Sequence, residues 1–488
     1  MRCHWISLDF GLLSIALLSH SVHAEFPIKK SEDSVERERK VTAQPDPDEG
    51  FRFLTEQAVL PSDFNQKVVD QIWESWPEPL RSRAESATPS QRRRMMFDRY
   101  GLTSRPGHIS DADRNPNGDP GKPLQYVVSE DGDWTMNCFS CHGGSVYGVP
   151  TPGAPNNQFA LQTMTEEVRR TKFRIGEPLT RMDFGSLVIP LGTTLGTTNA
   201  VVFGMGLMHF RDADLNVLDR PPASFTHHDM DAPPWWHFYK RPYLYIDGFA
   251  QKGHRGLMQF TLVPENGPEF YRQNEDHFKD VYAYLSSLRP PTYPHPIDPD
   301  LAQRGQHLFN QNCSQCHGTY GHHSDAESRA AYPNEMVPID EIGTDPVRHE
   351  ALSVEGRTKY AKSWFANVGQ RDEQATVVDP AGYVAPPLDG VWASAPYLHN
   401  GSVPTLWHVL HPSERPRVWR RTKVELNVSK VGLTVETTDR VPLEHPDVAF
   451  RRTFFDTRRF GKSASGHDYP DNLTEVEKTA VLEYLKTL

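Results

Sequence analysis

The sequence predicts a mainly helical protein built from two domains, with long loops and few strands. Two observations carry this prediction: the motif Cys-x-x-Cys-His occurs twice, and each copy is followed by a similar amphipathic segment at the end of its half of the chain. The length of 488 residues suits two or three domains. The 41 prolines and 33 glycines favour many loops over long regular elements.

The composition is that of a globular protein, and its charge narrows the class of partner. Apolar residues make up 37% of the chain, which is enough to build hydrophobic cores. The formal charge of -11 at pH 7 argues against a polyanionic partner, and the chain contains no nucleic-acid-binding motif. We therefore expect no nucleic acid among the partners.

The first residues have the pattern of a secretory signal peptide. Arg2 supplies a positive charge, an apolar stretch runs from Phe10 to Leu18, and the small residue Ala24 ends a cleavage-site pattern. We predict a signal peptide over residues 1–24; an uncleaved membrane anchor is the alternative, which the short apolar core disfavours. No later segment approaches the roughly 20 apolar residues that span a bilayer. The mature protein is therefore expected in the periplasm or outside the cell, without a membrane-spanning segment.

Cysteine usage indicates the cofactor. Of the five cysteines, Cys3 leaves with the signal peptide, and the other four form two Cys-x-x-Cys pairs, each followed directly by histidine. Two thioether bonds fix a haem through its vinyl groups, and the adjacent histidine supplies the proximal nitrogen to the iron. The sequence thus predicts two covalently bound haem c groups, with Cys138, Cys141 and His142 in the first site and Cys313, Cys316 and His317 in the second.

A Cys-x-x-Cys pair in an exported chain also fits a disulfide, a redox dithiol or half of a zinc site. None of these explains the histidine after each pair, or the glycine after each histidine. The flanking sequence agrees with haem at the second site, because Asp300–Phe309 has apolar residues at near-helical spacing. A turn-rich approach, Asp131–Trp134, precedes the first site.

The chain repeats the end of its first half at its C-terminus. The segment Val281–Leu288 (VYAYLSSL) resembles Val481–Leu488 (VLEYLKTL), and a capping box at Thr474 starts the second of these helices. The proline-rich stretch Arg289–Pro296 between the halves forbids helix continuation. We predict an N-terminal extension over 25–107, to which no chemistry is assigned, a first haem domain over 108–289 and a second over 290–488.

The sixth ligand of each iron separates an electron carrier from a catalyst. In the second half the only methionine, Met336, lies close in sequence to His317, which favours a distant histidine, either His399 or His467. In the first half the position is open or is filled by one of four candidates, namely Met182, Met205, Met208 and His209. An open position would bind oxygen or peroxide. Trp235 and Trp236 could pack between the two haems and shorten the path for electrons, although most tryptophan pairs pack in cores.

With the two haem motifs, the segment 395–401 (APYLHNG) and the duplicated closing helix, the chain resembles the di-haem cytochrome c peroxidase superfamily. The longer segment 387–406 (PLDGVWASAPYLHNGSVPTL) and the stretch from Phe455 to His467 look most like the rubber-oxygenase branch. The resemblance implies a mainly α fold of two cytochrome c-like haem domains, with Trp235 or Trp236 near the domain interface.

The resemblance also implies unequal roles for the two irons. The haem on His142 is the open, reacting one, and the haem on His317 has His467 as its second ligand and relays electrons, so the expected metal ligands are His142, His317 and His467. Peroxidases of the superfamily use a distal glutamate, but the segment after Trp236 offers His254 and no glutamate before Glu265. A histidine could act as the acid or base there. His254 and Trp236 are therefore the expected catalytic residues.

We thus expect an exported di-haem oxidoreductase that activates peroxide or dioxygen at one haem and acts on an unidentified organic substrate. A small electron-donor cytochrome is a possible partner. The alternative is a non-catalytic electron-transfer cytochrome in which both irons carry two protein ligands. A gas-sensing role is weaker, because the sequence contains no visible output domain.

Overall fold

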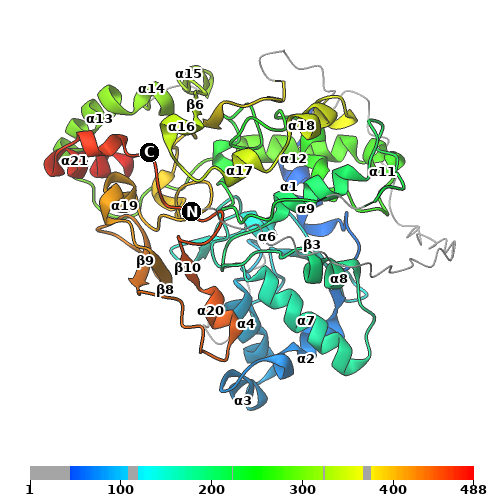
Figure 1. Ribbon diagram of the computed structural model, residues 1–488. Helices are drawn as coiled ribbons and strands as arrows, with labels where there is room; N and C mark the ends of the chain where they lie inside the picture. Colours follow the sequence, from blue (N-terminus) through cyan, green and yellow to red (C-terminus); the bar gives the residue numbers. More distant parts are fainter. Residues whose placement is uncertain (1–43, 108–118, 222–223, 322–324, 367–374) are drawn as a thin grey trace, which may run out of the picture. The chain divides into compact units, whose positions relative to one another are not determined.

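The computed structural model describes residues 44–107, 119–221, 224–321, 325–366 and 375–488 (Figure 1). The predicted signal peptide and the start of the predicted extension lie outside the described residues. Among the described helices, none combines the length and the apolar composition that crossing a bilayer requires.

The prediction of a mainly helical chain with few strands is confirmed. Helices of the first half are α1 (Pro47–Glu56), α2 (Gln66–Gln71), α3 (Leu80–Glu85), α4 (Pro89–Tyr100), α6 (Phe139–His142), α7 (Leu161–Ile175), α8 (Arg181–Val188), α9 (Ala200–His209), α10 (His254–Met258), α11 (Pro268–Gln273) and α12 (Glu275–Ser287). Helices of the second half are α13 (Pro299–Asn312), α14 (Ser314–His317), α15 (Asp325–Ala330), α16 (Ile339–Ile342), α17 (Val347–Glu350), α18 (Val354–Ala361), α19 (Leu406–Leu410), α20 (Val448–Arg452) and α21 (Glu475–Leu485).

Within the described residues the strands pair in small antiparallel sheets, ordered β1-β3-β2, β10-β8-β9, β4-β5 and β6-β7. Most of these strands are too short to form a layer of their own. Their bounds are β1 (Phe64–Asn65), β2 (Tyr126–Val128), β3 (Asp133–Met136), β4 (Ser145–Val146), β5 (Val149–Pro150), β6 (Met336–Pro338), β7 (Gly382–Val384), β8 (Val418–Asn427), β9 (Gly432–Thr437) and β10 (Phe454–Asp456).

The same helix pair occurs in each half. Figure 1 shows α1 beside α12 and α13 beside α21. Each pair crosses at a glycine: a β-carbon on Gly50 would lie 2.2 Å from a backbone oxygen of α12, and one on Gly305 would lie 1.9 Å from a backbone oxygen of α21. In both pairs the β-carbon of a tyrosine, Tyr284 or Tyr484, would lie 2.9 Å away. The repeated closing helices therefore have equivalent partners, and the partner in the first half lies in the predicted extension.

Hydrophobic cores are shared between the two halves. One core packs Trp236 and Ala154 of the first half against Trp392 and other residues of the second. A second core packs Phe365 among residues of the first half. The contacts group Pro45–Leu488 as one unit, so the predicted division of this part into two domains stays a prediction.

A buried ion cluster also joins the halves. Asp247 lies 2.8 Å from the guanidinium of Arg348 and accepts a hydrogen bond from Arg357. All three side chains are at most 1% exposed. Removing one partner from such a cluster leaves an uncompensated buried charge, which typically costs about 3–5 kcal/mol.

The close helix crossings at Gly50 and Gly305 predict that an added methyl group lowers the stability of the protein at either position. Gly50→Ala and Gly305→Ala should each lower the free energy of unfolding by about 1–3 kcal/mol, because the added methyl group meets backbone that has no room to move. Gly267→Ala is the control, since its β-carbon would have nothing within 4 Å. Urea unfolding followed by circular dichroism measures all three. Equal stability of the Gly305→Ala and Gly267→Ala variants would contradict the close crossing.

Candidate functional site

One cavity connects the two Cys-x-x-Cys-His motifs. Its volume is about 1380 Å³ and its walls are mainly apolar. Pockets for single small molecules usually measure about 300–1,000 Å³, so this cavity suits something larger than one such ligand. The residues of both motifs line it, namely Cys138, Cys141, His142, Cys313, Cys316 and His317.

The geometry of the four cysteines does not support the other interpretations of the motif. The four thiols form no disulfide. Within the described residues, no group of three or more histidine, cysteine, aspartate or glutamate side chains is arranged to hold a metal ion by itself. The cysteines therefore do not form one zinc site, and each pair faces the cavity beside its own histidine.

In the first site, the short helix α6 carries His142 into the cavity. His142 Nδ1 lies 3.0 Å from the carbonyl oxygen of Pro233, which can only accept, so Nδ1 carries the proton and Nε2 keeps its lone pair. Trp235 stacks on the imidazole, with ring centres 4.7 Å apart. Burial lowers the pKa of His142 to about 4, so the ring is neutral at pH 7, as a metal ligand must be.

The second site repeats this arrangement. His317 ends α14, and its Nδ1 lies 2.9 Å from the carbonyl oxygen of Pro386. Burial lowers the pKa of His317 as well. Both carbonyls belong to an Ala-Pro-Pro tripeptide, residues 232–234 and 385–387, a repeat that the sequence prediction missed. Proline fixes φ, so each tripeptide is a stiff support for the carbonyl that orients the imidazole.

His467 faces His317 across the cavity. The centres of the two imidazole rings are 6.1 Å apart, and the ring planes are inclined by 62°. Two imidazoles bound to one metal ion place their ring centres about 6 Å apart, because each metal–nitrogen bond is about 2 Å long and each ring centre lies about 1 Å behind its nitrogen. Burial lowers the pKa of His467 to about 3, which keeps this ring neutral too. The donor set therefore fits a haem iron between His317 and His467.

The loop around His467 is pressed against α16. The φ of His467 is +53°, and the preceding Gly466 has φ +75°. The His467 amide donates a 2.7 Å hydrogen bond to the carbonyl of Ile342. A β-carbon on Gly466 would lie 2.1 Å from the backbone of Gly343, so only glycine allows this approach. The backbone thereby fixes the direction of the imidazole.

His399, the other candidate ligand, occupies a different part of the wall. Its ring packs on Tyr383 with ring centres 4.6 Å apart, and its carbonyl accepts a hydrogen bond from the Asp231 amide. Burial lowers the pKa of His399 to about 3. Among the described residues, His467 is the histidine ring paired with His317, and the geometry therefore favours His467 as the ligand.

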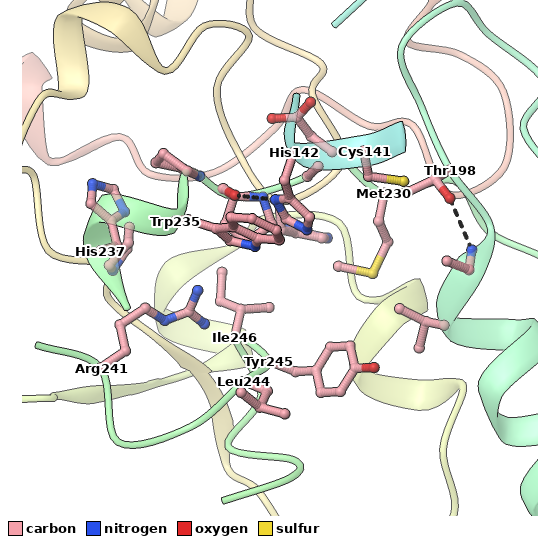
Figure 2. Close-up of a pocket in the computed structure, with 18 of the residues that line it drawn as sticks. Cys141, His142, Thr198, Met230, Trp235, His237, Arg241, Leu244, Tyr245 and Ile246 are labelled. Atoms are coloured by element: carbon pink, nitrogen blue, oxygen red, sulfur yellow. Dashed lines mark hydrogen bonds between the residues drawn. The ribbon is translucent and has the colours of Figure 1, made fainter. Parts of the chain in front are cut away.

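The cavity opposite His142 is lined mainly by apolar groups. Figure 2 shows Leu244, Tyr245 and Ile246 across the space from His142. No second histidine ring faces His142 in the described part of the chain in the way that His467 faces His317. The two sites therefore differ in the side that faces away from the proximal histidine.

The four residues that the sequence offers as sixth ligand of the haem expected at His142 lie in different environments. Met182 lines the cavity. Met205 is buried in a small core with Val202, and Met208 packs against a separate core. His209 bonds the carbonyl of Pro221 through Nε2 at 3.0 Å. A methionine that the sequence prediction missed, Met230, lies in the cavity wall near Cys141 (Figure 2).

The two expected catalytic residues lie in different places. His254 is hydrogen-bonded to Glu275 at 2.9 Å and is not among the residues that line the cavity, so its catalytic role stays a prediction that its position does not support. Trp236 is 1% exposed, and its Nε1 donates a 2.8 Å hydrogen bond to the carbonyl oxygen of Asp389. The tryptophan that contacts His142 is its neighbour, Trp235.

Asp389 connects the segments that carry the two proximal histidines. Its carbonyl oxygen accepts from Trp236 and from His237 Nε2, each at 2.8 Å. Its carboxylate pairs with the buried Lys240 at 2.8 Å. Asp389 follows Pro386 by three residues, and Trp235 and Trp236 directly follow the first Ala-Pro-Pro tripeptide. Asp389 therefore connects the two proline-containing segments whose carbonyls accept the hydrogen bonds of His142 and His317.

The assignment of His467 predicts a selective spectral change. With haem bound at the second motif, His467→Ala should free one coordination position of its iron, so that the protein binds one further equivalent of cyanide compared with the unaltered chain. His399→Ala should leave the number unchanged, because His399 is not paired with His317. Cyanide titration followed by Soret absorption measures both. A new cyanide site in His399→Ala, with none in His467→Ala, would reverse the assignment.

Comparison with known proteins supports a cytochrome relationship. Residues 382–420 match the family model described as RoxA-like, cytochrome c-like. This region contains the loop with His399 and the second Ala-Pro-Pro tripeptide. The match supports a relationship to rubber-oxygenase-like c-type cytochromes, and it is consistent with a haem-containing oxidoreductase that carries c-type haem.

Two proteins of Sinorhizobium fredii are similar to parts of the chain. The uncharacterized protein y4iM is 32% identical over 210 residues, which cover 38% of this chain and 45% of that protein. The uncharacterized protein y4iJ is 31% identical over 262 residues, which cover 42% of each chain. The matches thus span less than half the length of these relatives.

Proposed function

We propose that this chain is an exported di-haem c-type cytochrome oxidoreductase of the di-haem peroxidase superfamily. The site at His142 activates peroxide or dioxygen for the oxidation of an organic substrate, and the site at His317 relays electrons. The observation that carries the proposal is the difference between the sites: within the described residues, His317 has a facing histidine and His142 has none.

The chain's own residues support this division of roles. Haem c bound at both motifs supplies iron that exchanges electrons and, where one axial position is free, binds a small oxidant. His317 and His467 would hold one iron from both sides and leave no room for a ligand. His142 would hold the other from one side, and apolar groups such as Ile246 limit the access of water to the opposite side.

The exposed apolar residues of the cavity wall suggest the class of organic substrate. Phe184, Val188 and Phe260 line the cavity and are 58%, 78% and 42% exposed. Large apolar side chains that are exposed together, next to an apolar cavity, commonly mark a binding surface. An apolar substrate would therefore enter past α8 and reach the first site along a mainly apolar wall.

A series of stacking and hydrogen-bond contacts links the two sites and supports electron transfer between them. Trp235 stacks on His142, and Trp236 is its neighbour in the chain. The Trp236 hydrogen bond to Asp389 leads to the segment whose Pro386 carbonyl binds His317. Trp236 would thus act between the haems through packing and hydrogen bonding.

Met230 supports a second candidate function. Its side chain lies in the wall near the first site, so a thioether sulfur is available as a sixth ligand there. With that ligand in place, both irons would be closed and the protein would be a non-catalytic electron-transfer cytochrome. Cyanide binding discriminates between these functions.

The proposal predicts one accessible iron per chain. The oxidised protein should bind about one equivalent of cyanide, and Met230→Leu, which keeps the apolar volume, should bind the same amount with the same affinity. A Met230→Leu protein that binds cyanide when the unaltered protein does not would favour the electron-transfer function instead. Peroxide-dependent and dioxygen-dependent turnover of an apolar test substrate then separates the two oxidants.

The path through Trp236 predicts a kinetic effect without a spectral one. Trp236→Phe keeps an aromatic ring but removes the hydrogen bond to Asp389, and we expect electron transfer between the haems to slow by about tenfold, which corresponds to about 1.4 kcal/mol in the barrier. Flash photolysis of the half-reduced protein measures the rate. The absorption spectra of both haems should stay unchanged. Tyr271→Phe, which also removes one hydrogen bond of a buried aromatic side chain in the same half but lies outside the cavity wall, is the control.

A further inference from the structure

Arg241 is one of a few charged residues in the wall of a mainly apolar cavity, together with Arg181, Asp231 and Glu341. It is half-buried and lines the cavity beside the first motif. Figure 2 shows its guanidinium directed into the space on the opposite side of the His142 ring from Cys141. Its backbone is held in place, because the Arg241 amide donates a 3.2 Å hydrogen bond to the carbonyl of His237.

The guanidinium of Arg241 has no counter-charge of its own. In the described part of the chain, no carboxylate forms a hydrogen bond or ion pair with it. Two buried carboxylates of this region have other partners, since Asp389 pairs with Lys240, and Asp247 pairs with two other arginines. A third, Asp231, lines the cavity without an ion pair to Arg241, and burial raises its pKa well above the usual value, which favours the uncharged form. An uncompensated charge in an apolar environment costs several kcal/mol. A ligand that carries a negative charge would offset this cost.

We propose that Arg241 binds a propionate carboxylate of the haem attached at Cys138 and Cys141. The inference rests on the proposed haem at His142. A haem carries its two thioether-forming groups on one edge and its two carboxylates on the opposite edge. Arg241 lies on the opposite side of His142 from Cys141, where the carboxylate edge would fall. A guanidinium matches a carboxylate with two parallel hydrogen bonds, which makes arginine well suited to this contact.

This contact would set the reduction potential of the first haem. A positive charge next to a haem favours the reduced form, because reduction adds a negative charge to the iron. Arg241 would therefore raise the potential of the reacting haem and favour the flow of electrons toward it. The closed site between His317 and His467 would be less affected.

Spectroelectrochemistry tests the inference on the fully loaded protein. Arg241→Gln should shift the ratio of oxidised to reduced haem about tenfold at a given applied potential, which is a lowering of about 59 mV for a one-electron couple. One of the two couples should move, and the other should stay within experimental error. Arg241→Lys, which keeps the charge but not the two parallel bonds, should shift the same couple by less than half as much. Arg255→Gln is the control, because Arg255 pairs with Glu275 and does not line the cavity.

The result of the Arg241 test does not depend on whether the first haem has an open axial position. If the first haem proves to have two protein ligands, its potential should still respond to Arg241, because the carboxylate contact does not depend on an open axial position. If Arg241→Gln does not accumulate, Arg241→Met removes the same charge and carries the same expectation. Unchanged potentials in a variant with two bound haems, or equal shifts of both couples, would overturn the inference.

Discussion

The hydrogen bond from each proximal histidine to a proline carbonyl is the interaction on which both sites depend. His142 donates to Pro233 and His317 to Pro386. The bond fixes the tautomer and directs Nε2 into the cavity, and it would make the imidazole a stronger donor to a bound iron. Each carbonyl sits in an Ala-Pro-Pro tripeptide whose fixed φ angles resist displacement. The same tripeptides lead into the residues that join the halves, so ligand orientation and inter-half packing are coupled.

The two sites share this support but differ on the facing side of the cavity. At His317, a loop with two residues at positive φ brings His467 opposite the proximal ring. At His142, the facing wall is formed mainly by apolar side chains. The two halves are therefore alike where each would hold a haem and differ where, in the proposed function, the oxidant would bind. Under the proposed function, the mainly apolar walls would exclude water from the first site and admit an apolar substrate, while the second site would serve reversible electron transfer.

The sequence predicts the local features well and the long-range ones poorly. The haem motifs and the closing helices are contiguous patterns of a few residues, which is why they could be recognised directly. The supports of the proximal histidines lie 91 and 69 residues away in the chain, and only the repeated Ala-Pro-Pro tripeptide signals them. The partner of α12 lies in α1, inside a segment that looked like an extension, because a glycine crossing leaves no hydrophobic pattern of its own.

The positions of several individual side chains could not be predicted from the sequence either. Trp235 and Trp236 are adjacent in sequence, but one stacks on a histidine and the other is buried against Asp389, because neighbouring residues of the 3-10 helix Trp235–His237 point in different directions. Met230 and Arg241 carry no motif, and their importance follows only from their place in the cavity wall. The His254 assignment rested on an analogy with a distal glutamate, whereas its nearest polar partner is Glu275.

The electron paramagnetic resonance spectrum of the oxidised, unaltered protein tests most directly whether one site is open and the other closed. We expect one high-spin signal from the haem at His142 and one low-spin signal from the haem at His317, in equal amounts. Addition of cyanide should convert only the high-spin signal. Two low-spin signals that cyanide and peroxide leave unchanged would contradict the central claim that one site is open and the other is closed.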